Sequence, residues 1–378
     1  MKAVQTLVAA AAALLAGAAH ADITIGISLP LTGPASGLGI PMANYIKLWP
    51  QSIAGEKLNV IVLDDATDPT KGVTNAKKFI TEDKADIIMG SAATPVAIAM
   101  AGPIAESETP HFAFSPAVLP AGKDNWMFRL PQGNAVMAYA MIEHMKKHGV
   151  KTVGFLGYTD AYGESWLNDF KAQSQQLGGP QVIAVERFAR ADTSVTAQAL
   201  KLVAANPDAM LIVASGSGAA MPHKGIVERG YKGKIYQTHA AASRDLVRVG
   251  GKDVEGAFVS SGPAVIPEQL PANHPSKALA ADFVAKYEKA YGPGSRNQFG
   301  GHAYDAIVVL EKTVPVALKK AKPGTKEFRA ALRDALEGSK EIAGAHGIFN
   351  MSPADHLGLD QRAAVIVEIK NGAWVLTK

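Results

Sequence analysis

Residues 85–116 read ADIIMGSAATPVAIAMAGPIAESETPHFAFSP and contain the pattern that decides the fold. The run from 86 to 89 is short and apolar, as in a buried strand, and a Gly-Ser pair follows it. Thr94-Pro95 marks the start of a helix, because threonine serves as an N-cap and proline is tolerated in the first turn. Residues 111–115 read as the next strand. The stretch therefore predicts a strand–helix–strand unit of a parallel sheet.

The turn between this strand and this helix is a candidate anion site. Ligands of open α/β sheets bind at the carboxyl ends of the strands. The free amides and the dipole at a helix N-terminus favour a negative charge there. We therefore expect Thr94 and its neighbours to bind a small carboxylate.

The length of 378 residues favours two domains over a single core. Strands alternate with helices in two successive series, one on each side of Gly133, which is typical of parallel sheets covered on both faces. The expected fold class is therefore α/β, with two Rossmann-like lobes that have parallel-sheet cores. The last third of the chain is expected to return helices to the first lobe, and the hairpin signal Asn371-Gly372 is expected in the second.

The predicted boundaries follow from this alternation. The N-terminal lobe is expected to comprise residues 22–131 and 264–345, and the C-terminal lobe residues 132–263 and 346–378. Three strands that cross between the lobes are expected to form a hinge, near 130–133, 260–264 and 344–347.

Residues 1–21 have the features of a secretory signal peptide. A minimal positive start precedes an Ala/Leu/Val-rich run, and Ala19-His20-Ala21 fits a small-x-small cleavage site. The run is too short and too rich in alanine for a stable membrane span, and no second apolar stretch of spanning length follows it. The chain has no cysteine for lipid attachment or disulfides. We therefore predict a periplasmic protein, cleaved after Ala21.

Composition and motifs argue against several classes of function. The net charge of +4 is spread without basic blocks, which argues against nucleic acid as a partner. Gly216-Ser-Gly218 lacks the third glycine and the acidic residue of a dinucleotide fingerprint. No convincing nucleophile–base pair is present, so we expect neither an enzyme nor a cofactor. A secreted α/β enzyme stays an alternative, which turnover would distinguish from binding.

Two polar clusters are interpreted as structural, so no metal site is predicted. His144 and His148 lie four residues apart, but an exposed, lysine-rich helix end explains them better than a metal site. The acidic residues 64, 65 and 68 could suggest Mg²⁺ or Ca²⁺, yet helix capping and turn roles fit them better.

Five fragments together resemble one known family. They are Ile25–Pro34, Asp64–Pro69, Pro103–Glu106 with Ser115–Ala117, Asp160–Glu164, and Ala303–Ala306. In this order and spacing they resemble the periplasmic branched-chain amino acid binding proteins, the leucine/isoleucine/valine type of ABC-transporter solute receptor. The resemblance covers essentially the whole mature chain. It implies the type I periplasmic binding protein fold, a monomer without catalytic activity, ligand capture by hinge closure, and delivery to a membrane permease.

The resemblance also implies site residues. Thr94 matches the hydroxyl that takes the ligand carboxylate, and Tyr162 matches the loop tyrosine. Leu119 replaces a second ligand-binding hydroxyl, and His239 falls where the family has the acid that pairs with the ligand ammonium. From pattern alone, Tyr162 is expected in the cleft and His239 fits either the cleft or the core. The full predicted site is Leu38, Ala92, Ala93, Thr94, Ser115, Ala117, Leu119, Tyr162, Ser217 and His239, where Leu38 and Ser217 stand in for family aromatics.

The change at His239 bears on the ligand. A buried ammonium needs a charged or fully hydrogen-bonding partner, and a histidine in place of a carboxylate removes it. A histidine can instead donate to an oxygen of the ligand. We therefore expect a carboxylate that lacks an α-amino group, with an aromatic acid such as a benzoate or a phenylpropenoate as the lead. The alternatives are a branched-chain or other aliphatic amino acid and, less favoured, a ligand-sensing module for signalling.

Overall fold

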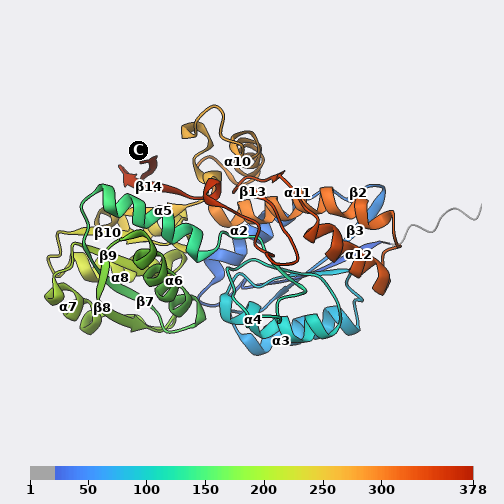
Figure 1. Ribbon diagram of the computed structural model, residues 1–378, viewed down its shortest axis with the longest axis horizontal. Coiled ribbons are helices and arrows are strands. Elements are labelled where there is room, and N and C mark those ends of the chain that lie inside the picture. The colour runs from blue at the N-terminus through green and yellow to red at the C-terminus, as the bar shows by residue number, and fades with distance from the viewer. Residues whose placement is uncertain (1–21, 378) are drawn as a thin grey trace, which may run out of the picture.

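The computed structural model describes residues 22–377, which form two α/β lobes lying side by side (Figure 1). The predicted fold class, two lobes with parallel-sheet cores, is confirmed. The predicted signal peptide, residues 1–21, lies outside the described residues. None of the helices between residues 22 and 377 is long and apolar enough to cross a membrane.

The first lobe contains a six-stranded sheet in the order β2–β3–β1–β4–β5–β6. Its pairs are parallel except for β2 with β3. The strands are β1 (Ile23–Leu29), β2 (Ser52–Ile53), β3 (Glu56–Asp64), β4 (Ile87–Gly90), β5 (His111–Ala113) and β6 (Met127–Arg129). The helices of this lobe are α2 (Ser36–Ile46), α3 (Pro69–Thr81), α4 (Thr94–Glu106), α10 (Lys277–Tyr291), α11 (Gln298–Leu318) and α12 (Lys326–Glu337).

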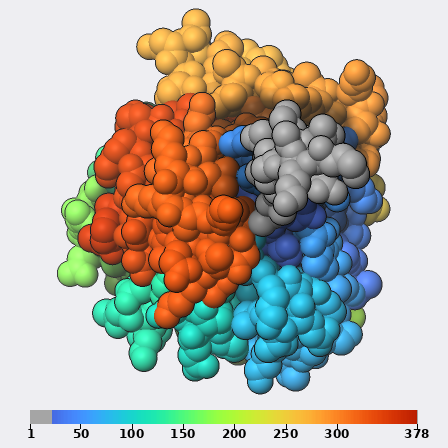
Figure 2. Space-filling view, turned by 90° about the vertical axis from the view of Figure 1, so that its right-hand side faces the viewer, coloured from blue at the N-terminus to red at the C-terminus, as the bar shows by residue number. Residues whose placement is uncertain are grey.

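Both faces of this sheet are covered. Successive side chains of a strand point to opposite faces, so Ile87 and Met89 join one core while Ile88 joins another. The first core contains side chains of α2, α10, α11 and α12, and the second contains side chains of α3 and α4. In Figure 2 the late helices, in orange, lie against N-terminal segments in blue and cyan. Trp49 Nε1 donates to Ala303 O over 3.0 Å and joins these distant stretches.

The second lobe contains a seven-stranded sheet in the order β15–β14–β11–β10–β9–β7–β8. Its pairs from β8 to β11 are parallel, whereas β14 and β15 add in antiparallel fashion as the predicted C-terminal hairpin. The strands are β7 (Thr152–Tyr158), β8 (Gln181–Phe188), β9 (Ala209–Val213), β10 (Lys234–Gln237), β11 (Phe258–Ser261), β14 (Val365–Lys370) and β15 (Ala373–Leu376). The helices are α5 (Asn134–Lys147), α6 (Ala161–Leu177), α7 (Thr196–Ala205), α8 (Ala220–Val227) and α9 (Arg244–Gly250).

Short elements connect these layers. Strands β12 (Ile342–Ala343) and β13 (Ile348–Phe349) form a small antiparallel hairpin. The 3₁₀ turns are η1 (Gly216–Ala219), η2 (His239–Ala241), η3 (Gly251–Val254), η4 (Pro263–Val265), η5 (Pro267–Gln269) and η6 (Gln361–Ala363). The structural roles expected for two acids are confirmed: Asp68 caps α3 by accepting from Thr70 N over 2.7 Å, and Asp64 accepts from Leu31 N over 2.8 Å in the first turn.

The chain passes between the two sheets three times. The first crossover lies at 130–133, between β6 and α5. The second begins at 261–263, after β11, and Val265 and Leu270 still pack in the core of the second lobe before α10 is reached. The third lies at 363–365, between η6 and β14, which is later in the chain than the predicted 344–347. The reason is that Phe349 and Leu359 are buried in the core of the first lobe, so the chain stays there. Residues 344–347 instead form the turn of the β12–β13 hairpin, where Gly344 N donates to Gly347 O over 2.8 Å.

Candidate functional site

A cavity lies between the two lobes at the carboxyl ends of several strands. About 360 Å³ of space free of protein atoms lies within it, a figure that includes the open solvent at its mouth. Residues of the first lobe and of the first crossover line one side, and residues of the second lobe line the other. The lining residues are Leu38, Ala92, Thr94, Phe114, Pro116, Pro131, Tyr162, Arg190, Ser215, His239, Ala240, Phe299 and His302. Both lobes therefore contribute contacts to any molecule that occupies the cavity.

The β4–α4 turn supplies the helix N-terminus on the first-lobe side. The structure corrects one detail here: Ala93, not Thr94, is the N-cap, and Thr94 is the first helical residue. The Ala93 amide is instead held by Ser91 Oγ at 3.1 Å. Thr94 is buried, and its hydroxyl makes no hydrogen bond to any other described residue. Because the hydroxyl is not needed for capping, it is free to bind a ligand at the positive end of the α4 dipole.

Arg190 is the one cationic side chain among the residues that line the described cavity. It follows β8, and its guanidinium lies 4.1 Å from the ring centre of Tyr158. Nε donates to Asp160 Oδ2 over 2.5 Å, and Nη1 donates to Ser215 Oγ over 3.0 Å. Nη2 has no acceptor among the described residues. The arginine is thus held in place by three neighbours and retains a free donor for an anion.

Tyr162 enters the cavity from the first turn of α6. Asp160 caps this helix by accepting from Tyr162 N over 3.0 Å, while its other oxygen holds Arg190. The tyrosine hydroxyl lies 2.9 Å from Thr238 Oγ1, at the end of β10. Burial raises the pKa of Tyr162, so the phenol stays protonated at neutral pH. One carboxylate thus positions both the tyrosine backbone and the arginine.

Two neutral histidines face the cavity from opposite lobes. His239 lies in η2, and burial lowers its pKa to about 3. His302 lies in α11, and burial lowers its pKa well below the ordinary value. The Nδ1 atom of each ring is buried without a partner, both rings line the cavity, and neither Nε2 is among the buried atoms without a partner. A buried donor without an acceptor is costly, and we infer that each ring carries its proton on Nε2, as a donor toward a ligand oxygen.

The rest of the wall is apolar. Leu38 comes from α2, Phe114 follows β5, and Phe299 lies in the first turn of α11. Pro116 and Pro131 add rigid apolar surface without amide donors. Among the lining residues of the described chain there is no aspartate and no glutamate. The cavity therefore combines one cation, several neutral hydrogen-bonding groups and two aromatic rings of phenylalanine.

The structure brings five of the ten predicted site residues together. They are Leu38, Ala92, Thr94, Tyr162 and His239, and all line the cavity. The other five do not line it: Ala93, Ser115 and Ala117, which are neighbours in sequence of lining residues, and Leu119 and Ser217. Ala117 and Leu119 pack with Ala97 and Met127 in a small core, and Ser217 lies in η1, two residues beyond Ser215.

Five polar or aromatic lining residues were not predicted from the sequence: Phe114, Arg190, Ser215, Phe299 and His302. Arg190 and Ser215 each come shortly after a strand, β8 and β9, so the rule that ligands bind at the carboxyl ends of strands could have indicated them. His302 and Phe299 lie on a helix far along the chain, and no local signal marks them.

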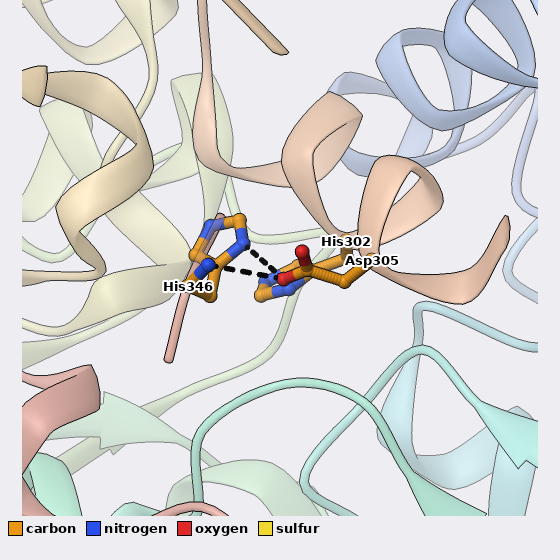
Figure 3. A group of neighbouring side chains, drawn as sticks. All are labelled: His302, Asp305 and His346. Carbon is orange, nitrogen blue, oxygen red and sulfur yellow. Dashed lines mark hydrogen bonds and ion pairs between the residues drawn. The ribbon is translucent and has the colours of Figure 1, made fainter. Parts of the chain in front are cut away.

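His302, Asp305 and His346 form a buried group whose nitrogen and oxygen atoms lie within 4.8 Å of one another (Figure 3). This spacing is compatible with a metal ion, although none was predicted. The Asp305 carboxylate, however, already accepts from Ala345 N at 2.5 Å, from His346 N at 3.1 Å and from His346 Nδ1 at 2.9 Å. Both oxygens of Asp305 already accept hydrogen bonds from the protein, so the group serves to fix the segment 345–346 to α11.

Comparison with known proteins agrees with the fold. A family model described as periplasmic binding protein matches residues 22–373. An extracellular ligand-binding receptor from Rhodopseudomonas palustris is 49% identical, with a TM-score of 0.92 over 94% of this chain and 99% of that one. Leu/Ile/Val-binding protein homolog 3 from Brucella melitensis is 25% identical over 94% of each chain.

A third similarity concerns the fold alone. A solute-binding protein of an ABC transporter from R. palustris, solved in complex with benzoate, is 22% identical to this chain. Its TM-score is 0.79, over 94% of this chain and 95% of that one.

Proposed function

Since the chain belongs to the periplasmic binding protein family, we propose that it captures a small carboxylate without an α-amino group, with aromatic acids as the leading class. The acid binds in the interlobe cavity when the hinge closes, and the receptor then delivers it to the permease of an ABC transporter. Members of this family are ligand-binding receptors of ABC-transporter type, and family membership implies a periplasmic location.

The observation that carries this proposal is the charge of the cavity wall. No acidic side chain among the lining residues can pair with an ammonium, whereas Arg190 offers a cation. An α-amino acid in this cavity would bury its ammonium without a partner, and an unpaired buried charge costs several kcal/mol. A carboxylate without an ammonium avoids this cost.

The polar groups suggest how the acid is held. The free Nη2 of Arg190 and the hydroxyls of Thr94 and Ser215 are donors for the carboxylate. Arg190 also pairs with Asp160, so it is positioned before the ligand arrives, which lowers the ordering cost of binding. The dipole of α4 adds to the attraction for an anion.

The apolar groups support an aromatic body. Phe114, Phe299 and Leu38 give a ring contacts on its faces and edges, and aromatic pairs are worth about 0.5–1.5 kcal/mol beyond burial of area. The neutral Nε2–H groups of His239 and His302 suit a second oxygen on the ligand, such as a hydroxyl. The benzoate complex of the R. palustris relative is consistent with this class of ligand for the fold.

Calorimetric titration tests the proposal. Benzoate and cinnamate are compared with leucine, isoleucine and valine at pH 7 in protein that has been unfolded and refolded to remove carried-over ligand. We expect saturable binding of at least one aromatic acid and none of the amino acids. Tight leucine binding with no response to the acids would contradict the proposal and favour the branched-chain amino acid alternative.

A further inference from the structure

One polar face of α11 joins the cavity to the crossovers. Gln298, His302 and Asp305 lie at positions i, i+4 and i+7 of this helix, so they share a face, and all three are buried. Gln298 Oε1 accepts from Gly262 N on the second crossover over 2.8 Å. Its Nε2 donates to His239 O in the second lobe over 3.3 Å. This face therefore contacts both η2, which contains the cavity-lining His239, and the second crossover.

His302 stacks on a second histidine that does not reach the cavity. The ring centres of His302 and His346 lie 4.2 Å apart at an interplanar angle of 26°. Asp305 fixes His346 through both its backbone amide and its Nδ1 atom (Figure 3). Of these two rings only that of His302 lines the cavity. A ligand that contacts His302 thus contacts a ring that also stacks on the ring of His346.

The His346 ring also packs closely against the second crossover, at Gly262. A side chain at Gly262 would overlap the His346 ring on one side and the Gln132 amide on the other. Gly262 has a φ of −81°, so the glycine is needed there for space and not for a left-handed backbone. Gln132, on the first crossover, donates from Nε2 to Ala363 O on the third over 3.1 Å. The three crossovers therefore pack in one continuous chain of contacts that ends at His346.

We propose that His346 is a positioning residue that couples occupancy of the cavity to closure of the lobes, acting through the His302 ring. The idea rests on the proposed function, because it concerns how a solute receptor of this kind closes. When the lobes rotate, the backbone at Gly262 moves past the His346 ring, and close-packed groups of this kind have few alternative arrangements. A ligand held against His302 stabilises the ring stack in one arrangement and so shifts the equilibrium toward the closed state.

The test compares His346→Gln, His302→Gln and the double variant with wild type. His144→Gln is the matched control. The exposed position expected for His144 is wrong, because its ring packs on Tyr236 and Phe258 and is buried. Like His302 it is a stacked histidine, with its ring 4.1 Å from that of His148, but it does not line the cavity. Affinity for benzoate, cinnamate and leucine is measured by calorimetry. Lobe separation is measured by energy transfer between labels on cysteines introduced at the exposed positions Val118 and Leu200, one in each lobe, which is specific because the chain has no native cysteine.

We expect His346→Gln to weaken the tightest of these solutes about tenfold, although the residue does not line the cavity, and to change the lobe separation of the ligand-free protein. The double variant should lose no more affinity than the weaker-binding single variant, because both act on one contact. His144→Gln should leave affinity and separation unchanged. Additive losses, or a His346→Gln protein with wild-type affinity and separation, would overturn the proposal.

The two proposals fail differently. If wild type binds none of the three solutes, the proposed function fails, and the ligand-free lobe separation still tests the role of His346. If His346→Gln does not fold, Gly262→Ala tests the same contact from the crossover side, since the added methyl pushes on the His346 ring. An unchanged lobe separation in a folded Gly262→Ala protein then counts against the coupling.

Discussion

The guanidinium of Arg190 lies 4.1 Å from the ring centre of Tyr158 while its Nε donates to Asp160. The arginine therefore has an aromatic face below it, a carboxylate at one edge and the cavity at the other. This arrangement leaves the side chain few rotamers and gives a carboxylate a preorganised partner. It also makes Arg190 the first residue on which the proposed function can be tested.

Arg190→Gln should weaken benzoate binding about a hundredfold, because removal of one partner from a buried charge pair costs about 2–5 kcal/mol. Arg187→Gln is the control: Arg187 lies three residues earlier and pairs with Glu164 at the surface, where its side chain is 40% exposed. Calorimetry measures both. Equal affinities in wild type and Arg190→Gln would mean that the carboxylate binds elsewhere.

Thr94→Val removes the unpartnered hydroxyl at the start of α4 and keeps the volume of the side chain. A hydrogen bond to a charged group is worth about 1.5–3 kcal/mol, so benzoate affinity should fall by about tenfold or more. Thr313→Val provides the comparison, because Thr313 is also a buried helical threonine but donates to Val309 O away from the cavity. If both variants bind benzoate as wild type does, Thr94 is not a ligand contact.

His239→Asp places a carboxylate where the resemblance to the branched-chain amino acid binding family implies one. The new charge should repel an aromatic acid and offer a partner to an ammonium, so benzoate affinity should fall by at least about tenfold while leucine binding becomes measurable. His239→Asn separates charge from shape, since it changes the ring without adding a charge and should gain no leucine binding. If both variants bind leucine, or if neither does, the charge at position 239 does not determine the class of ligand.

The β4–α4 unit was predictable from sequence because its signals are local. An apolar run, a glycine and a Thr-Pro pair specify a strand, a turn and a helix start, and the structure has β4 at Ile87–Gly90 and α4 from Thr94. The same holds for Asp160 and Tyr162, since a capping aspartate fixes the residue two places after it. Where a side chain is positioned by the start of its own helix, the local sequence is sufficient to predict where it lies.

The remaining residues of the cavity wall could not be predicted in this way, because they are positioned by elements far apart in the sequence and not by their own helix ends. Arg190 reaches the cavity only because β8 and β9 lie on either side of β7, which brings Asp160, Arg190 and Ser215 together. His302 faces it only because α11 returns to the first lobe after five strands of the second sheet, β7 to β11, have formed. Ser217 was predicted two residues from Ser215, an error of register in a small-residue loop where no side chain fixes the alignment.

Two helix glycines should respond in opposite directions to alanine. A Cβ at Gly301 would overlap the His346 ring, whereas nothing lies within 4 Å of a Cβ at Gly102. Gly301→Ala should lower the free energy of unfolding by about 1–3 kcal/mol through overpacking. Gly102→Ala should raise it by about 0.5–1 kcal/mol through helix propensity. Urea unfolding measures both, and a stabilised Gly301→Ala would mean that the His346 ring moves freely.

Stability should fall as the pH is lowered, and one buried histidine offers a way to isolate the cause. Burial lowers the pKa of His144 to about 4 from its ordinary 6.5, with the neighbouring charges of His148, Lys147 and Lys234 acting in the same direction. Its Nδ1 lies 3.0 Å from the Tyr236 hydroxyl, and its Nε2 is buried without a partner. The native ring therefore stays neutral where the unfolded chain is already protonated.

The sign of the effect follows from this difference. Between about pH 6.5 and pH 4 the unfolded state binds a proton that the native state does not, so the free energy of unfolding declines by up to about 1.4 kcal/mol per pH unit for this residue. His144→Gln removes the titrating group, and its stability should depend less steeply on pH across this window, whatever its stability at pH 7.5. Urea unfolding at half-unit pH intervals measures both slopes. Parallel curves for wild type and variant would mean that His144 takes up its proton without unfolding, and that solvent reaches the ring in the native protein.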